Sequence, residues 1–297
     1  MINVQQLLQN TVVLSYTMKK WGNSRKADKE KIQTDSDKSR LKLSKELIEC
    51  DEYAAITSYQ GQIRQWLNLR AVPSFFRDAL MLVKIDMTDE VERYLQRAQQ
   101  SQVGMVEQLI VVYPERKEDA RRALNGLYNE DDYPAPDKLR DLFAIKWNWI
   151  ALGVPETLPD TIRQQENAKL QNLWEESIQE IIKSLREGFK ELVDHAVDRL
   201  TVRPGEKPKV FRDTFVTNFK AFLDTFSARN IVNDTELARL VDNAKDILRG
   251  ITADELRQDI STRNYVARKF TELKAVADES VMSISRKFDF GDMKKMA

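Results

Sequence analysis

The sequence IRQQENAKLQNLWEESIQEIIKSLREGFKELVDHAVDRL, from Ile162 to Leu200, decides the fold of this chain. No proline interrupts the wider stretch between Pro159 and Pro204, and Gly188 is its only glycine. Its apolar residues recur every eleven residues, which is close to three turns of an α-helix, so they form one continuous stripe. The stripe contains Leu170, Trp174, Ile178, Ile181, Leu185, Phe189 and Leu192, and it ends at Ala196 and Leu200.

A helix over this stretch would be roughly 58 Å long, whereas helices of globular proteins average about 10–14 residues. Most helical stability comes from packing an apolar face, so we expect a partner along the whole stripe. Thr161 and Gln164 have the spacing of a capping box at its start. The turn over 201–209, with Pro204-Gly205, is expected to end the helix.

Composition indicates a soluble, cytoplasmic and mainly α-helical protein. The 47 basic and 47 acidic residues cancel, so no global field favours nucleic acid or membranes. A charged fraction of 32% with 9 Gly and 8 Pro is typical of long, solvated helices. The single cysteine, Cys50, fits a reducing compartment. We expect no signal peptide and no membrane span.

A small sheet is predicted in the N-terminal half. Apolar and polar residues alternate from Val12 to Met18, which is the period of a strand. A strand needs a partner, and the short alternating run Met81–Met87 is the best candidate.

Between these strands, the basic arm Lys19–Lys45 carries ten Lys and Arg residues against four acids. It has two interpretations. A mobile arm could bind phosphates and stack a base on an aromatic ring. Charge runs usually only solvate, however, so a solvated loop leading into a helix is favoured. The candidate nucleic-acid contacts are Lys19, Lys20, Trp21, Arg25 and Lys26.

Further helices are predicted on both sides of the central one. In the N-terminal half they cover Lys38–Arg70, Thr88–Tyr113, Glu115–Tyr128 after Pro114, and the aromatic run Leu139–Leu152. After the central helix, Phe211, Phe215, Phe219, Phe222 and Phe226 form a stripe that is read as core.

The C-terminal helices carry clear start signals. Asn233 with Glu236 predicts a cap for a helix over Thr235–Arg249, and Thr252 with Glu255 predicts a capping box. The last helix runs towards Phe288 with a seven-residue seam that Arg263 and Lys274 interrupt. That seam pairs Leu256 with Ile260, Ala267 with Phe270, Ala277 with Val281, and Ile284 with Phe288.

No residue pattern announces catalysis, a metal or a cofactor. The only histidine, His195, shares a helix face with Glu191 and Asp198, but a solvated surface explains that trio better than a metal site. The three adjacent acids 130–132 are likewise read as solvated. Cys50 and His195 could pair only if the fold joined them, and no glycine-rich phosphate loop exists. We therefore expect a non-enzyme without cofactors.

Five short motifs stand out along the chain. They are Arg70-Ala71-Val72-Pro73-Ser74-Phe75-Phe76-Arg77, Asp132-Tyr133-Pro134, Asp137-Lys138-Leu139-Arg140, Gly153-Val154-Pro155 and Ala228-Arg229-Asn230. Together they resemble an uncharacterised bacterial and phage family. Its members sit on mobile elements, often beside a MoxR-type AAA+ ATPase and a von Willebrand A-domain protein. The resemblance implies an ATPase partner, and it offers no established activity or catalytic residues to carry over.

The sequence thus predicts a mainly α long-helix bundle with a coiled-coil-like antiparallel arm and a small sheet. We expect an N-terminal domain over 1–158 and a long-helix domain over 159–297. The leading hypothesis is a non-catalytic scaffold or adaptor that binds a second copy or the ATPase through its helices. The alternative is a nucleic-acid-binding protein that uses the basic arm, and an unrecognised acidic hydrolase ranks last.

Overall fold

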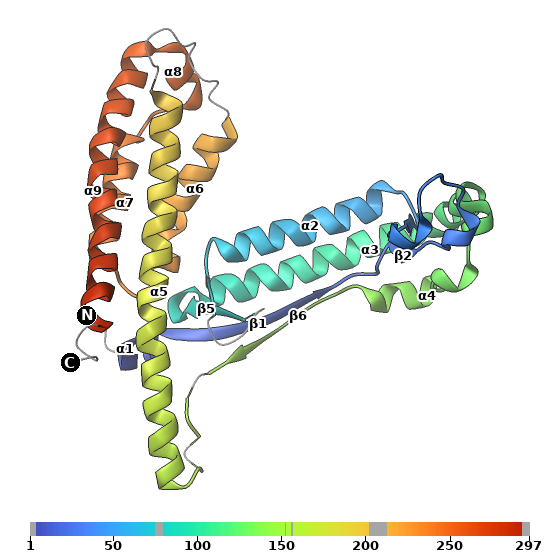
Figure 1. Ribbon diagram of the computed structural model, residues 1–297, viewed down its shortest axis with the longest axis horizontal. Coiled ribbons are helices and arrows are strands. Elements are labelled where there is room, and N and C mark those ends of the chain that lie inside the picture. Colours follow the sequence, from blue (N-terminus) through green and yellow to red (C-terminus); the bar gives the residue numbers. More distant parts are fainter. Residues whose placement is uncertain (1–3, 75–79, 152, 156, 202–212, 293–297) are drawn as a thin grey trace. The chain divides into compact units, whose positions relative to one another are not determined.

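The structure, a computed structural model, is mainly α-helical with a small sheet (Figure 1). It describes residues 4–74, 80–151, 153–155, 157–201 and 213–292. The helices are α1 (Val4–Asn10), α2 (Asp51–Asn68), α3 (Thr88–Leu124), α4 (Pro136–Leu139), α5 (Asp160–Leu200), α6 (Asp213–Arg229), α7 (Thr235–Ile247), α8 (Ala253–Gln258) and α9 (Ile260–Asp292). The strands are β1 (Thr11–Lys19), β2 (Ser24–Lys26), β3 (Ser44–Glu46), β4 (Val72–Pro73), β5 (Leu80–Lys84) and β6 (Ala144–Ile150).

The two predicted strands exist and are neighbours. Strand β1 contains the predicted run Val12–Met18, and β5 contains the start of the run Met81–Met87. The sheet order is β4-β5-β1-β6, so β1 and β5 are adjacent. Strand β4 pairs antiparallel with β5, with Val72 opposite Leu82. Val72 and Pro73 of the motif Arg70–Arg77 form this short strand, and Phe75 and Phe76 lie outside the described residues.

The chain forms two compact units that are not consecutive in sequence. The α5 unit combines Met1–Val13, Leu69–Met87 and Ile150–Ala297, and the α3 unit combines Leu14–Asn68 and Thr88–Trp149. This division differs from the expected boundary at 158. The early segments join the late helices because Leu7, Val13, Val72 and Leu82 are buried in the same core as α5.

The predicted central helix is present as α5, and its main neighbour is α9. The two helices run antiparallel side by side, since Arg263 near the start of α9 bonds Leu200 at the end of α5, whereas Lys274 pairs with Asp194. Helix α6 packs on α7 and β5. Phe219, Phe222 and Phe226 of α6 are buried, which confirms their interpretation as core. Phe211, the side chain of Phe215 and the turn after Thr201 lie outside the described residues.

The predicted caps meet three different outcomes. The Thr252–Glu255 capping box starts α8, with both reciprocal bonds formed. At α7, Asp234 and not Asn233 caps the helix by accepting from the backbone N of Leu237. At α5, Pro159 occupies the cap position without a side-chain bond, so the expected Thr161–Gln164 box is wrong.

The predicted seam of the last helix is shifted. Phe270 and Ala277 are buried as expected, but Ile260 is exposed. Asp259 ends the regular structure of α8 and caps α9, so the expected single helix is two. The face of α9 that enters the core consists of Arg263, Val266, Phe270, Leu273, Ala277 and Ser280. The side chains of Ile284 and Phe288 are not described.

In the α3 unit, three predicted helices change. Helix α2 starts only at Asp51, because Lys38–Glu46 forms a short 3-10 turn and strand β3. Helix α3 continues through Pro114, so the two helices expected around this proline are one. Tyr113 and Ala120, before and after the proline, pack in one core, and this packing offsets the lost backbone bond.

The aromatic run Leu139–Leu152 was predicted as a helix, but its central part, Ala144–Ile150, is strand β6. Leu139 ends α4, Arg140–Leu142 forms a 3-10 turn, and Leu152 lies outside the described residues. Trp147 and Trp149 both donate their indole N–H to Oε2 of Glu92, at 2.7 and 2.9 Å. Residues i and i+2 share a face only in a strand, so this double contact requires the extended form. Among the described residues, no helix is long and apolar enough to cross a lipid bilayer.

Candidate functional site

The predicted helix seam is used inside the chain. Trp174, Ile178, Ile181, Leu185 and Phe189 are buried in the core of the α5 unit, with Phe189 stacked on Phe222 of α6. Leu170 and Leu192 are half-buried against the same core. From Trp174 onwards, the seam therefore offers no free apolar stripe to another molecule.

Arg263 and Lys274, which interrupted the expected seam, both have partners within the chain. Buried Arg263 donates from Nε to the Leu200 carbonyl at 3.1 Å and from Nη2 to the Arg199 carbonyl at 2.8 Å, which satisfies two orphan carbonyls at the end of α5. Lys274 and Lys190 both bind Asp194. Burial raises the pKa of Asp194, but these hydrogen bonds outweigh it and leave the pKa below its usual value.

Several cations of the basic arm bind acceptors within the protein itself. Arg25 of β2 lies directly opposite Lys45 of β3, and Asp132 binds both, at 3.8 Å and 2.7 Å. Lys45 is buried, and it also donates to the Leu127 carbonyl at 2.6 Å. Lys31 donates to the Gly126 carbonyl at 2.8 Å.

The motif Asp132-Tyr133-Pro134 is therefore structural. Tyr133 donates its hydroxyl to the Leu47 carbonyl at 2.9 Å, and the Pro134 carbonyl accepts from the Tyr113 hydroxyl at 3.0 Å. Glu130, in the same acidic triplet, binds Lys117 and Arg121. Two of the three adjacent acids thus bind side-chain cations of the protein.

Trp21 cannot serve as a stacking platform. Its side chain is 3% exposed and packs edge-on against Tyr53 and Tyr113, with ring centroids at 6.2 and 5.8 Å. Lys20 lies over the Tyr53 ring and donates to the Thr57 hydroxyl at 3.4 Å. Of the predicted nucleic-acid contacts, Lys19 and Lys26 are the exposed cations without a partner in the part of the chain described.

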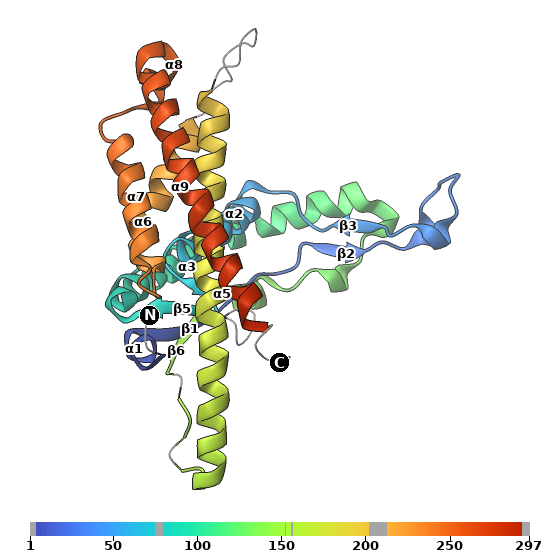
Figure 2. The same cartoon turned by 60° about the vertical axis from the view of Figure 1, so that its left-hand side comes forward.

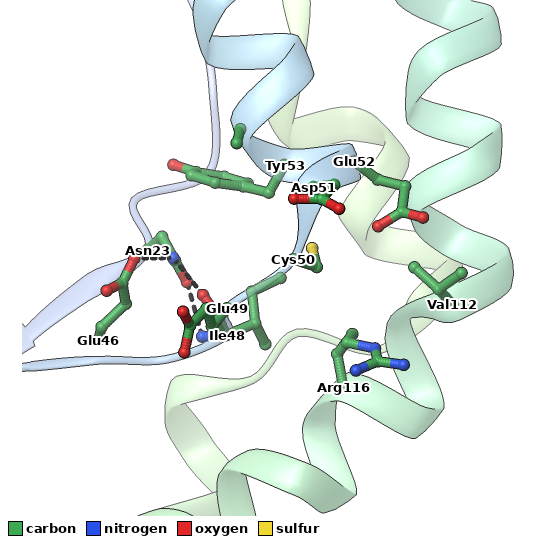
Figure 3. Close-up of a pocket in the computed structure, with 11 residues that line it drawn as sticks. Asn23, Glu46, Ile48, Glu49, Cys50, Asp51, Glu52, Tyr53, Val112 and Arg116 are labelled. Carbon is green, nitrogen blue, oxygen red and sulfur yellow. Dashed lines mark hydrogen bonds between the residues drawn. The ribbon is translucent and has the colours of Figure 1, made fainter.

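A pocket of about 550 Å³ lies at the start of α2 in the α3 unit (Figure 3). Figure 3 shows Cys50 with Arg116 of α3 on the opposite side of the pocket. Asn23 bridges the wall by donating to Glu46 Oε1 at 3.0 Å and accepting from the Ile48 backbone N at 2.8 Å. The remaining acidic lining residues are Glu49, Asp51 and Glu52.

Cys50 is the potential nucleophile of this pocket. Burial raises the pKa of Cys50, so its thiol is protonated at neutral pH and is a weak nucleophile. His195, the candidate base, belongs to the other unit, where its Nε2 accepts from Arg199 Nε at 3.2 Å. A search of the described residues finds no cluster of three or more His, Cys, Asp or Glu that could hold a metal.

A second cavity, the α7–α9 groove, has the character of a docking surface. Its volume is about 410 Å³, and it is lined by Leu240 and Ile247 of α7 and by Leu273 of α9. On the α9 rim, Tyr265 is 49% exposed and Val276 is 48% exposed. The polar rim consists of Asn243, Asp246, Lys269 and Glu272.

The exposed segment of α5 (Asp160–Leu173) is another surface with exposed apolar side chains. None of its residues is buried, and Ile162 and Leu173 are 45% and 39% exposed. In Figures 1 and 2, this end of α5 extends beyond α6, α7 and α9. Sequence reasoning assigned the whole stripe to one seam and missed both surfaces.

Comparison of the chain with protein-family models, with curated proteins and with solved structures gives no match.

Proposed function

We propose that this chain is a non-catalytic scaffold or adaptor that acts through protein–protein contacts, with the α7–α9 groove as its docking surface. The groove carries the proposal. Tyr265 and Val276 stand half-exposed beside an apolar floor of Leu240 and Leu273. A helical groove with an apolar floor and a polar rim is suited to bind the apolar face of another helix.

The chemistry of the other surfaces supports a binding role over a catalytic one. The Cys50 pocket offers a neutral thiol without a base, and its Asn23 amide is engaged by Glu46 and Ile48. The net charge of zero gives no general attraction to nucleic acid. The family resemblance adds a MoxR-type AAA+ ATPase as a candidate partner beside a second copy of the chain.

The test uses charge introduced into the groove. We expect Val276→Asp to weaken self-association, or binding to a MoxR-type ATPase encoded in the same genome, by about tenfold or more, since a buried apolar side chain contributes about 1.5–3 kcal/mol. Val111→Asp is the matched control, because Val111 is exposed on α3 in the other unit. Both interactions are measured by analytical ultracentrifugation of the full chain.

Two results would contradict the proposal. One is a wild-type chain that neither self-associates nor binds the ATPase at high concentration. The other is an interaction that Val276→Asp and Tyr265→Asp leave unchanged, with both variants folded by circular dichroism.

A nucleic-acid-binding ribbon is the second candidate. Lys26 ends strand β2 and Lys42 lies two residues before β3. Both side chains are exposed, and neither has a partner among the described residues. A two-stranded ribbon fits the major groove of DNA. If this role is real, binding falls steeply with salt and the substitutions Lys26→Gln and Lys42→Gln weaken it. Binding that survives both changes would exclude the ribbon as the site.

A further inference from the structure

The exposed segment of α5 and the rim of the α7–α9 groove carry the same pattern of spacing with opposite charges. On α5 the residues at steps of four, three and four are Ile162, Glu166, Lys169 and Leu173. On α9 the residues at the same steps are Tyr265, Lys269, Glu272 and Val276. Each set has an apolar residue at both ends, eleven residues or about 16 Å apart along the helix.

The order of the charges selects one alignment. When the two segments lie parallel, Glu166 meets Lys269 and Lys169 meets Glu272, with the apolar residues matched at each end. When they lie antiparallel, both pairs bring like charges together. Like charges in contact are unfavourable, so the parallel alignment is the complementary one.

These charges are available at the surface. Lys169 binds Glu166 within α5 at 2.6 Å, and Lys269 binds Glu272 within α9 at 2.8 Å. All four side chains are more than a third exposed, so a partner can share them without breaking a buried pair. Exposed pairs of this kind contribute little to folding, which leaves their charge free to select a partner.

The alignment also satisfies the symmetry of a dimer. Within one chain α5 and α9 run antiparallel, so a second α5 that lies parallel to α9 runs antiparallel to the first α5. A two-fold axis perpendicular to the helices produces this arrangement. The groove segment lies beside the last turns of α5, and the exposed segment forms its first turns. Both contacts can therefore form at once about the middle of α5.

We propose that the α7–α9 groove binds the exposed segment of α5 from a second copy of this chain, parallel to α9, in a reciprocal two-fold dimer. The proposal rests on the proposed function and names its partner. The dimer joins Ile162 to Tyr265, Glu166 to Lys269, Lys169 to Glu272 and Leu173 to Val276, twice.

The experiment reverses the charges without changing the net charge. The first variant, Glu166→Lys with Lys169→Glu, reverses the segment, and the second, Lys269→Glu with Glu272→Lys, reverses the groove. Each keeps an i,i+3 ion pair within its own helix, so the monomer fold is preserved. We expect either variant alone to raise the dimer Kd about 100-fold, because four attractive contacts become repulsive.

Mixing the two variants is the decisive experiment. In a mixture of the two variants, the reversed segment meets the reversed groove and the native segment meets the native groove, so a heterodimer of wild-type strength forms. The quadruple variant is also expected to dimerise like the wild type. The control reverses Asp37 and Arg40, an exposed i,i+3 pair in the other unit, and leaves the Kd unchanged.

Three results would overturn the proposal. The first is a wild type that is still monomeric at about 100 μM, well above the Kd of a micromolar dimer. The others are reversed variants that dimerise normally, and a mixture or quadruple variant that stays monomeric. The proposed function fails separately. If Val276→Asp still abolishes ATPase binding in a monomeric chain, the groove is a docking surface and only its occupant is wrong.

Discussion

At the scale of single residues, Arg186 shows how a charged helix position becomes part of a core. Its guanidinium binds the Asp234 carboxylate through Nε at 2.7 Å and Nη2 at 3.0 Å, and Nη1 donates to the Ser280 carbonyl at 2.9 Å. One side chain thus joins α5, the cap of α7 and α9. In the sequence, Arg186 stands among many charged residues and nothing distinguishes it from a solvated arginine.

Removing this cation should destabilise the α5 unit strongly. Arg186→Met leaves the buried Asp234 carboxylate without its partner, and breaking a buried pair in this way costs about 3–5 kcal/mol. Arg163→Met, whose partner Asp160 is exposed, should cost less than about 1 kcal/mol. Urea unfolding followed by circular dichroism measures both. A loss below about 1 kcal/mol for Arg186→Met would show that the network is dispensable.

The lowered pKa of Asp259 makes the stability of the fold depend on pH. Hydrogen bonds from Thr262 and Ser261 lower its pKa from 3.8 to about 2 in the folded chain. A lowered folded pKa stabilises the fold above the unfolded value of 3.8, and this stabilisation is lost as the pH falls towards 2. We expect Asp259→Asn to melt at a lower temperature than the wild type at pH 7. The difference should shrink between pH 4 and pH 2, and a constant difference over that range would refute the assignment.

At the scale of elements, the sequence predicts those whose periodicity is long and unbroken. Helix α5 follows from its eleven-residue repeat, and α8 follows from the Thr252–Glu255 box. The helix predicted over the aromatic run is wrong, because such a short run fits both the helical and the strand period. Only the contacts of Trp147 and Trp149 with Glu92 of α3 decide for strand β6. The proline rule failed at Pro114, because tertiary packing on both sides outweighed one lost backbone bond.

Asp132 anchors the β2–β3 ribbon of the basic arm through its ion pairs with Arg25 and Lys45. Asp132→Asn leaves the buried Lys45 ammonium without its anion, so we expect a loss of roughly 1–3 kcal/mol. Amide hydrogen exchange in β2 and β3 should rise at the same time, since Arg25 and Lys45 share this anchor. Asp131→Asn is the control within the same triplet. Unchanged exchange in Asp132→Asn would mean that the hydrogen bonds of Tyr133, Lys45 and Lys31 hold the ribbon without Asp132.

At the scale of the whole molecule, a linear sequence hides which distant segments share a core. The expected boundary at 158 precedes the long helix, yet residues 1–13 and 69–87 belong to the α5 unit. The docking groove was hidden for a similar reason. The spacing of Tyr265 and Val276 can be read from the sequence, but only the buried face through Val266 and Phe270 shows that they lie outside the core.

This division predicts how fragments behave. A fragment of residues 159–297 keeps α5 to α9 but loses Leu7, Val13, Val72 and Leu82, which are buried against them. Each buried apolar side chain contributes about 1.5–3 kcal/mol, and their loss leaves apolar surface in water. We expect the fragment to be helical, to melt well below the full chain and to bind the dye ANS. Co-expression with residues 1–158 should restore the melting temperature and abolish ANS binding, because the missing strands then complete the core. A fragment 159–297 that melts like the full chain and binds no dye would show that the late helices form a self-sufficient domain, as the linear boundary implied.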